Sequence, residues 1–114
     1  MGSEMCIRDS AKHENPMVRA TAAASPHASP AMLRALAVDD DPKVREWVAR
    51  NTSTPLSVLR TIAYTEEQAP IRAFVAWNPN VDDQTLNFLA QDGDPQVEQV
   101  AKMVLDSRAE GMVE

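Results

Sequence analysis

The chain of 114 residues contains few of the residue types that build catalytic and metal sites. Its single cysteine, Cys6, can neither form an internal disulfide nor supply a thiolate metal site alone. Its three glycines, at positions 2, 93 and 111, are too scattered for a phosphate-binding loop. The two histidines, His13 and His27, show no metal-ligand spacing and no recognisable Ser–His–Asp grouping. We therefore expect no catalytic residue, no cofactor and no metal site, and predict that the chain is not an enzyme.

Long apolar runs are also missing. No window approaches the run of about 18 apolar residues that a membrane span requires, and residues 1–10 lack the apolar segment of a secretory signal. We accordingly expect a cytoplasmic protein with no membrane partner. The formal net charge of −6 repels a phosphate backbone, so nucleic acid is not an expected partner unless a local basic face overrides that charge.

An internal repeat is the main feature that the sequence does contain. The pattern Pro-(x)-Val/Ile-Arg occurs three times and once in altered form, with its leading Val or Ile at positions 18, 44, 71 and 97. The steps between them are 26, 27 and 26 residues. A second pattern, Leu-x-x-Leu/Ile-Ala, begins at Leu33, Leu59 and Leu86 with steps of 26 and 27. Two patterns in one register predict tandem repeats.

A turn separates the two patterns in each unit. Residues 25–30, 51–55 and 78–82 are rich in Pro, Asn and Ser, which end one helix and allow the next to begin. Three pairs are expected to cap a helix and supply its first residue: Asp41-Pro42, Thr54-Pro55 and Asp94-Pro95.

Each unit should therefore hold two short helices, which must stack on neighbouring units to bury their apolar faces. We predict an all-α solenoid of tandem two-helix repeats with a period of 26–27 residues. Its parts are a non-repeat segment at 1–12, repeats at 13–37, 38–63 and 64–90, and a capping repeat with a tail at 91–114.

Apolar residues at i, i+3 and i+4 give each helix one inward stripe. Val44, Trp47 and Val48 show this spacing on a first helix, and Leu59, Ile62 and Ala63 show it on a second. The predicted repeat core is Val18, Leu33, Leu36, Val44, Val48, Leu59, Ile62, Ile71, Val75, Leu86, Leu89 and Val97.

Two further columns accompany each leading Val or Ile. The residue one place after it is Arg19, Arg45, Arg72 and then Glu98, and the residue five places after it is Ala23, Ala49, Ala76 and then Lys102. We expect the alanines to let repeats approach closely and the arginines to bridge to acidic loop residues such as Asp39 or Asp41. The fourth unit changes both columns and should run as one helix from about Pro95 to Arg108, which is typical of a cap.

The N-terminal end shows no segment comparable to the predicted C-terminal cap. Residues 1–12 fit no repeat column, and the string Met-Cys-Ile-Arg-Asp-Ser at 5–10 resembles translated adapter sequence. We place no functional weight on Cys6 and expect the chain to be a fragment of a longer solenoid.

Residues 36–55, Leu-Ala-Val-Asp-Asp-Asp-Pro-Lys-Val-Arg-Glu-Trp-Val-Ala-Arg-Asn-Thr-Ser-Thr-Pro, resemble the repeat unit of the leucine-rich repeat variant family. The resemblance spans about residues 13–104, and the Asn-x-x-Thr-Pro turn distinguishes it from ordinary HEAT-like repeats. It implies a right-handed superhelix, related to HEAT and armadillo arrays, in which α-helices alternate with 3₁₀ or short helical segments. Some members carry an iron–sulfur segment with clustered cysteines, which this chain lacks, and the family implies no single activity.

Acidic clusters at 39–41, at 66–67 and at 92 and 94 each precede a predicted helix start. They lack the spacing of a calcium loop, so we predict that they cap helices.

A candidate interaction surface centres on Trp77 and Arg50, which lie beside the core stripe six residues after the leading position. Trp47 and Phe74 lie nearby, and Arg34 and Arg60 complete the candidate set. Trp and Arg are enriched at interface hot spots. The alternative is that Trp77 packs against the adjoining turn at Pro79.

The function that these observations favour is a non-catalytic, monomeric scaffold for protein–protein interaction. One alternative is a nucleic-acid-binding HEAT-like module that uses Arg19, Arg34, Arg45, Arg60 and Arg72 as basic rows. Another is an accessory repeat domain of a larger enzyme. Salt-dependent retention on DNA would favour the first alternative.

Overall fold

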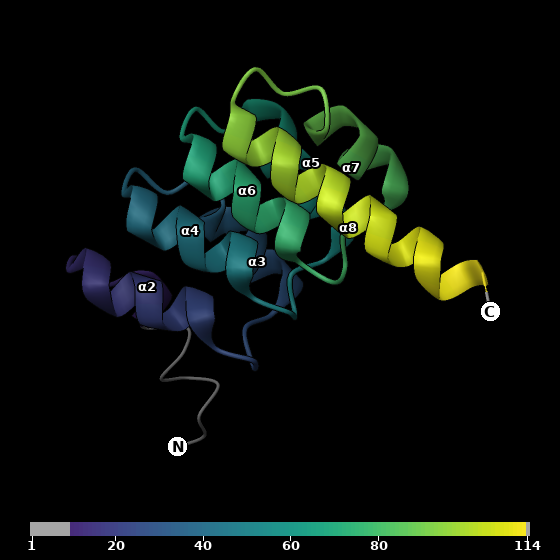
Figure 1. Cartoon of the computed structure of the whole chain (residues 1–114). Helices are drawn as coiled ribbons and strands as arrows, with labels where there is room; N and C mark the ends of the chain where they lie inside the picture. Colours follow the sequence, from purple (N-terminus) through teal and green to yellow (C-terminus); the bar gives the residue numbers. More distant parts are fainter. Residues whose placement is uncertain (1–9, 114) are drawn as a thin grey trace.

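The computed structural model describes residues 10–113, and the described residues are helical apart from their turns. The expectations for residues 1–9, including Cys6, lie outside the described residues. The helices, shown in Figure 1, are α2 (Pro16–Ala24), α3 (Pro30–Leu36), α4 (Pro42–Arg50), α5 (Leu56–Thr65), α6 (Ala69–Trp77), α7 (Asp83–Leu89) and α8 (Pro95–Val113).

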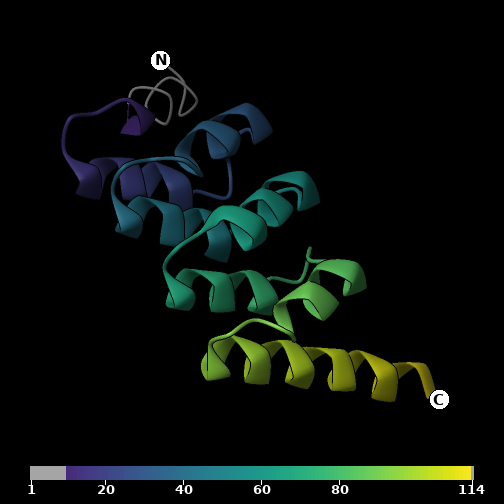
Figure 2. The same cartoon turned by 90° about the horizontal axis from the view of Figure 1, so that it is seen from above.

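The helices form two layers. α2, α4, α6 and α8 lie side by side in one layer, where each contacts the next. α3, α5 and α7 form the second layer, with α5 against α7 (Figure 2). The chain alternates between the layers, as two-helix repeats require, and the predicted all-α solenoid is confirmed. Its extents are 49 × 31 × 17 Å.

The second-layer helices are short α-helices, so the 3₁₀ form that the resemblance also allowed does not occur in residues 10–113. Their first and last amides make i to i−4 bonds, for example Leu33 N to Ser29 O at 2.9 Å and Ala90 N to Leu86 O at 2.8 Å. A 3₁₀-helix would instead close each turn with an i to i−3 bond.

Most helix starts follow the capping chemistry that the sequence predicts. The Asp41 carboxylate accepts from Lys43 N at 2.8 Å, and the Asp94 carboxylate accepts from Gln96 N at 2.9 Å. Thr54 does not cap α5, whose flanking residue is Pro55. Its hydroxyl instead donates at 2.7 Å to Val48 O, a carbonyl near the end of α4 that also accepts from Asn51 N at 3.3 Å.

The core runs between the two layers. Eleven of the twelve predicted core residues are buried, and eight of these are 0% exposed: Leu33, Val44, Val48, Leu59, Val75, Leu86, Leu89 and Val97. Val18 is only half-buried. Helix α2 packs against α4 on one side, and no described helix of the same layer covers its other side.

The last helix differs from the others of its layer. α8 has 19 residues, whereas α2, α4 and α6 have 9 each. It therefore continues as one helix through the position where the others turn, as expected for residues 95–108. No helix within residues 10–113 combines the length and the apolarity that a membrane crossing needs.

Candidate interaction surface

Two recurring sets of polar contacts tie neighbouring repeats together, and further contacts between successive turns, such as Asn80 Nδ2 to Thr52 O and Thr54 O, add to them. The first set, which we call the Arg rungs, joins Arg19 to Asp39, Arg45 to Glu66 and Arg72 to Asp92. The shortest N–O distances in these pairs are 2.8, 2.8 and 2.7 Å. Each guanidinium makes two hydrogen bonds to its carboxylate, a geometry that favours arginine over lysine.

Each Arg rung also fixes a loop. Arg45 Nη1 donates to the carbonyls of Asp39 and Asp40, and Arg72 Nη1 donates to those of Glu66 and Glu67. The predicted bridge from the arginine column to Asp39 is confirmed, while Asp41 caps α4 instead. The clusters at 39–41 and at 92 and 94 thus serve both helix capping and contacts between repeats. The predicted cap at 66–67 is wrong: α6 has Gln68 at its N-cap with no side-chain hydrogen bond, because the Glu66 carboxylate is turned to Arg45.

The arginines change the titration of their partners. Burial by itself raises the pKa of Asp39, but the hydrogen bonds from Arg19 and Asp41 N outweigh it and place the pKa below its ordinary value. Burial acts in the same way on Glu66, whose pKa is also lowered overall by Arg45. The hydrogen bond from Arg72 lowers the pKa of Asp92.

The second set, which we call the Asn rungs, was not predicted from the sequence. Asn51 Nδ2 donates to Ala23 O at 2.7 Å and to Ser25 O at 2.8 Å. Asn78 Nδ2 donates to Ala49 O at 2.8 Å and to Asn51 O at 2.9 Å. Both asparagines are buried, and their recurrence 27 residues apart was the available signal. From the sequence, these asparagines are expected only to end helices.

The alanine column lies where the helices of the first layer meet. Ala23, Ala49 and Ala76 are each 0% exposed, as their predicted role in close approach requires. The absence of a larger side chain lets the carboxamide of each Asn rung reach the carbonyls at the end of the preceding helix.

Most arginines of the proposed basic rows are therefore bound to carboxylates. Arg60 on α5 also pairs with Asp82. The Thr85 side chain and Arg60 lower the pKa of Asp82 to about 2. Arg34 on α3 is exposed, but it and Arg60 lie on helices of the second layer, and neither lines a hollow that Trp77 lines. The structure thus separates these two arginines from the rest of the candidate set.

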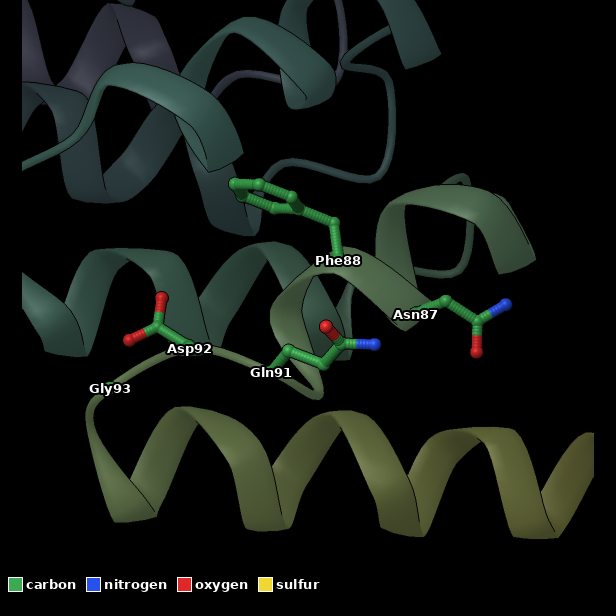
Figure 3. A pocket seen from close by; sticks show the side chains of 5 residues that line it. All are labelled: Asn87, Phe88, Gln91, Asp92 and Gly93. Carbon is green, nitrogen blue, oxygen red and sulfur yellow. The ribbon is translucent and has the colours of Figure 1, made fainter.

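An open pocket of about 490 Å³ lies where α7 leads into α8, and its lining is drawn in Figure 3. Phe88 points away from Asp92 toward α5, where it meets Tyr64 edge to face with ring centroids 4.5 Å apart. The Asp92 carboxylate is already bound by Arg72, and Asn87 points outward. No group of three His, Cys, Asp or Glu within residues 10–113 could hold a metal ion.

The other candidate residues do come together, on the first layer. Arg50 stacks on Trp47 and on Phe74, with its guanidinium carbon 4.1 and 4.9 Å from the two ring centroids. Trp47 and Phe74 are half-buried against the core, while Trp77 is 54% exposed and Met103 on α8 is 49% exposed. About half of the Trp77 side chain is therefore exposed to solvent, although Pro79 lines the same hollows beside it.

Trp77 separates two open hollows. The first, which we call the Arg50 hollow, has a volume of about 200 Å³ and is lined by Arg50, Thr52, Phe74, Trp77 and Pro79, with Asn78. The second, which we call the Arg108 hollow, has a volume of about 470 Å³ and lies between Trp77 and Met103 on α8. We call Trp77, Arg50, Phe74, Pro79 and Met103 together the Trp77 surface.

The comparisons with known proteins agree with the repeat architecture. The leucine-rich repeat variant domain matches residues 47–104, just over half of the chain. The matched segment contains both asparagines of the Asn rungs and all five residues of the Trp77 surface. No curated protein and no solved structure shows significant similarity to the chain. The chain belongs to the leucine-rich repeat variant family.

Proposed function

We propose that this chain is a non-catalytic repeat scaffold that binds another protein through the Trp77 surface. The observation that carries the proposal is the exposure of Trp77, 54%, between two hollows on the layer of first helices. A tryptophan that served only the core would be covered, as the leucine side chains between the layers are. Large exposed aromatic side chains beside apolar hollows are typical of interface hot spots.

The nucleic-acid alternative has less support. Arg19, Arg45 and Arg72 are engaged in Arg rungs, and Arg60 pairs with Asp82. A phosphate backbone would have to displace these carboxylates on a chain whose net charge is −6.

The first test compares stability. Trp77→Ala should lower the free energy of unfolding by less than about 1 kcal/mol, because half of the side chain is already in water. Leu59→Ala, at a fully buried position, should cost about 2–5 kcal/mol. Urea unfolding measures both, and equal losses would remove the basis for Trp77 as a binding residue.

The second test measures binding. A random peptide library displayed on phage is selected against the purified chain, and the enriched peptides are titrated against variants. We expect Trp77→Ala to weaken binding at least about tenfold, while Tyr64→Ala, an exposed aromatic of the second layer, leaves it unchanged. Peptides that bind Trp77→Ala as well as the parent would contradict the proposal.

A further inference from the structure

Arg50 is the cation of the Trp77 surface, and most of its guanidinium N–H groups make no hydrogen bond to the described residues. Its Nη1 donates to Glu46 at 3.2 Å, and within residues 10–113 its Nε and Nη2 make no hydrogen bond. The side chain is 39% exposed and lines the Arg50 hollow. Arg108, at the other hollow, donates instead to Asp83 and to Val81 O, at 2.8 and 2.7 Å.

The two aromatic rings hold the Arg50 guanidinium in place. Its carbon lies 4.1 Å from the centroid of Trp47 and 4.9 Å from that of Phe74. Stacking of this kind orients the planar group and limits its rotation. An oriented guanidinium loses less conformational entropy when it binds a carboxylate, so it is better suited to recognition than a mobile surface arginine.

The charges nearby also favour an anion of low charge. Glu46 lies between Lys43 and Arg50, at 3.5 and 3.2 Å, so the three residues together carry one positive charge. This local positive charge contrasts with the net charge of −6 of the whole chain. A single carboxylate can approach Arg50 without displacing Glu46, and the net charge of the whole chain repels it less than it repels a doubly charged phosphate.

We propose that the Trp77 surface binds a polypeptide segment in which an Asp or Glu stands next to an apolar residue. The carboxylate accepts hydrogen bonds from Arg50 in the Arg50 hollow, and the neighbouring apolar side chain packs on Trp77 and Pro79. This inference rests on the proposed function, since it names the kind of partner that the same surface takes.

The experiment uses an array of synthetic nonapeptides with a central leucine. The residue beside the leucine is Glu, Gln or Lys, and the other positions are randomised. Binding of the labelled full chain is measured at low and at physiological salt. We expect Glu peptides to bind at least about tenfold more tightly than Gln peptides, with a preference that weakens as salt rises.

Variants of Arg50 separate its role from that of Trp77. Arg50→Gln should abolish the preference for Glu over Gln, and Arg50→Lys should retain only part of it, because lysine lacks the planar fork. Trp77→Ala should weaken all three peptide classes together. Circular dichroism and urea unfolding check that the variants remain folded, as expected for a partly exposed side chain.

The outcomes distinguish the two proposals. Peptides that bind through Trp77 with no preference for Glu, or with a preference that Arg50→Gln leaves intact, would overturn this inference and leave the proposed function standing. Binding that is insensitive to Trp77→Ala would overturn both.

Discussion

Two neighbouring contacts of the first layer, α4 with α6 and α6 with α8, both contain an Arg rung. They differ in the Asn rung, which only one of them has. The Arg rung joins Arg45 to Glu66 in the first and Arg72 to Asp92 in the second. Only the first contains an Asn rung, from Asn78 to the carbonyls of Ala49 and Asn51. In α8 the corresponding column holds Val104, which has no donor, and the buried Ala76 carbonyl accepts no hydrogen bond from the described residues.

The comparison of the two contacts indicates a different role for each kind of rung. The Arg rungs fix the loops before the first helices, and they occur wherever such a loop follows. The Asn rungs occur where a first helix ends and turns, at Asn51 and Asn78. α8 does not turn there, and about one helical turn later Arg108 donates to Val81 O in the preceding turn. The loss of a turn and the loss of an Asn rung therefore go together.

Among the polar contacts between repeats, replacing an Asn rung should lower the free energy of unfolding the most. Asn78→Ala removes both hydrogen bonds to Ala49 O and Asn51 O and leaves the buried Ala49 carbonyl without that donor, while Asn51 O still accepts from Thr54 N. We expect a loss of about 2–4 kcal/mol in the free energy of unfolding, measured in urea. Val104→Ala is the matched control in the same column and should cost about 1 kcal/mol, since it breaks no hydrogen bond. Equal losses at the two positions would show that the Asn rung adds nothing beyond packing.

Replacing an Arg rung should have a smaller effect. Arg72→Gln removes the paired hydrogen bonds to Asp92, whose side chain is 10% exposed. We expect a loss of about 1–3 kcal/mol. The control is Arg50→Gln, which breaks a more exposed pair and should cost under about 1 kcal/mol. If the two variants unfold at the same urea concentration, the Arg rungs do not stabilise the contact between repeats.

Acid should weaken the Arg rungs and spare the Asn rungs. The pKa values of Asp39, Glu66 and Asp92 are lowered in the folded protein. Groups with lowered pKa values stabilise the fold above their unfolded pKa, near 4, and this contribution is lost as the pH falls through the folded value. We expect stability to decline from pH 5 downward, with a smaller decline in Arg72→Gln and an unchanged decline in Asn78→Ala. A parent whose urea midpoint is the same at pH 6 and pH 3 would contradict this.

The smallest change in stability is expected on the outer face of α8, at Glu98 and Lys102. These residues replace the arginine and alanine of the columns that face the next repeat. Glu98→Arg combined with Lys102→Ala should alter the unfolding free energy by no more than about 0.5 kcal/mol. It should nevertheless promote self-association, seen by sedimentation velocity, because the face then resembles one that stacks. A variant as monomeric as the parent would mean that α8 is not a cap.

The repeat period, the two-helix unit and most of the core follow from local patterns, because the spacing of apolar residues determines which side of a helix can be buried. The Arg19–Asp39 bridge was predictable for a related reason, since an arginine and an acidic residue recur at the same places in successive units. Val18 shows that the spacing of apolar residues does not by itself predict burial. Its pattern matches that of Val44, but burial depends on which helix covers it.

The roles of polar residues were harder to predict. Thr54 looked like a helix cap, and its hydroxyl instead serves the Val48 carbonyl. Asn51 looked like a helix breaker, and its carboxamide joins two repeats. In both cases the partner is a backbone carbonyl, which every residue possesses, so no sequence pattern could single it out.

By itself, the sequence determined that this chain is a stack of two-helix repeats, because periodic apolar and capping residues act over distances of a few residues. Packing in three dimensions sets which polar side chains join repeats and which stay at the surface. Arg72 and Arg50 carry the same side chain at different places in the repeat; one lies between helices against Asp92 and the other lies on two rings at the surface. That distinction depends on distances between residues about 20 positions apart, which only packing sets.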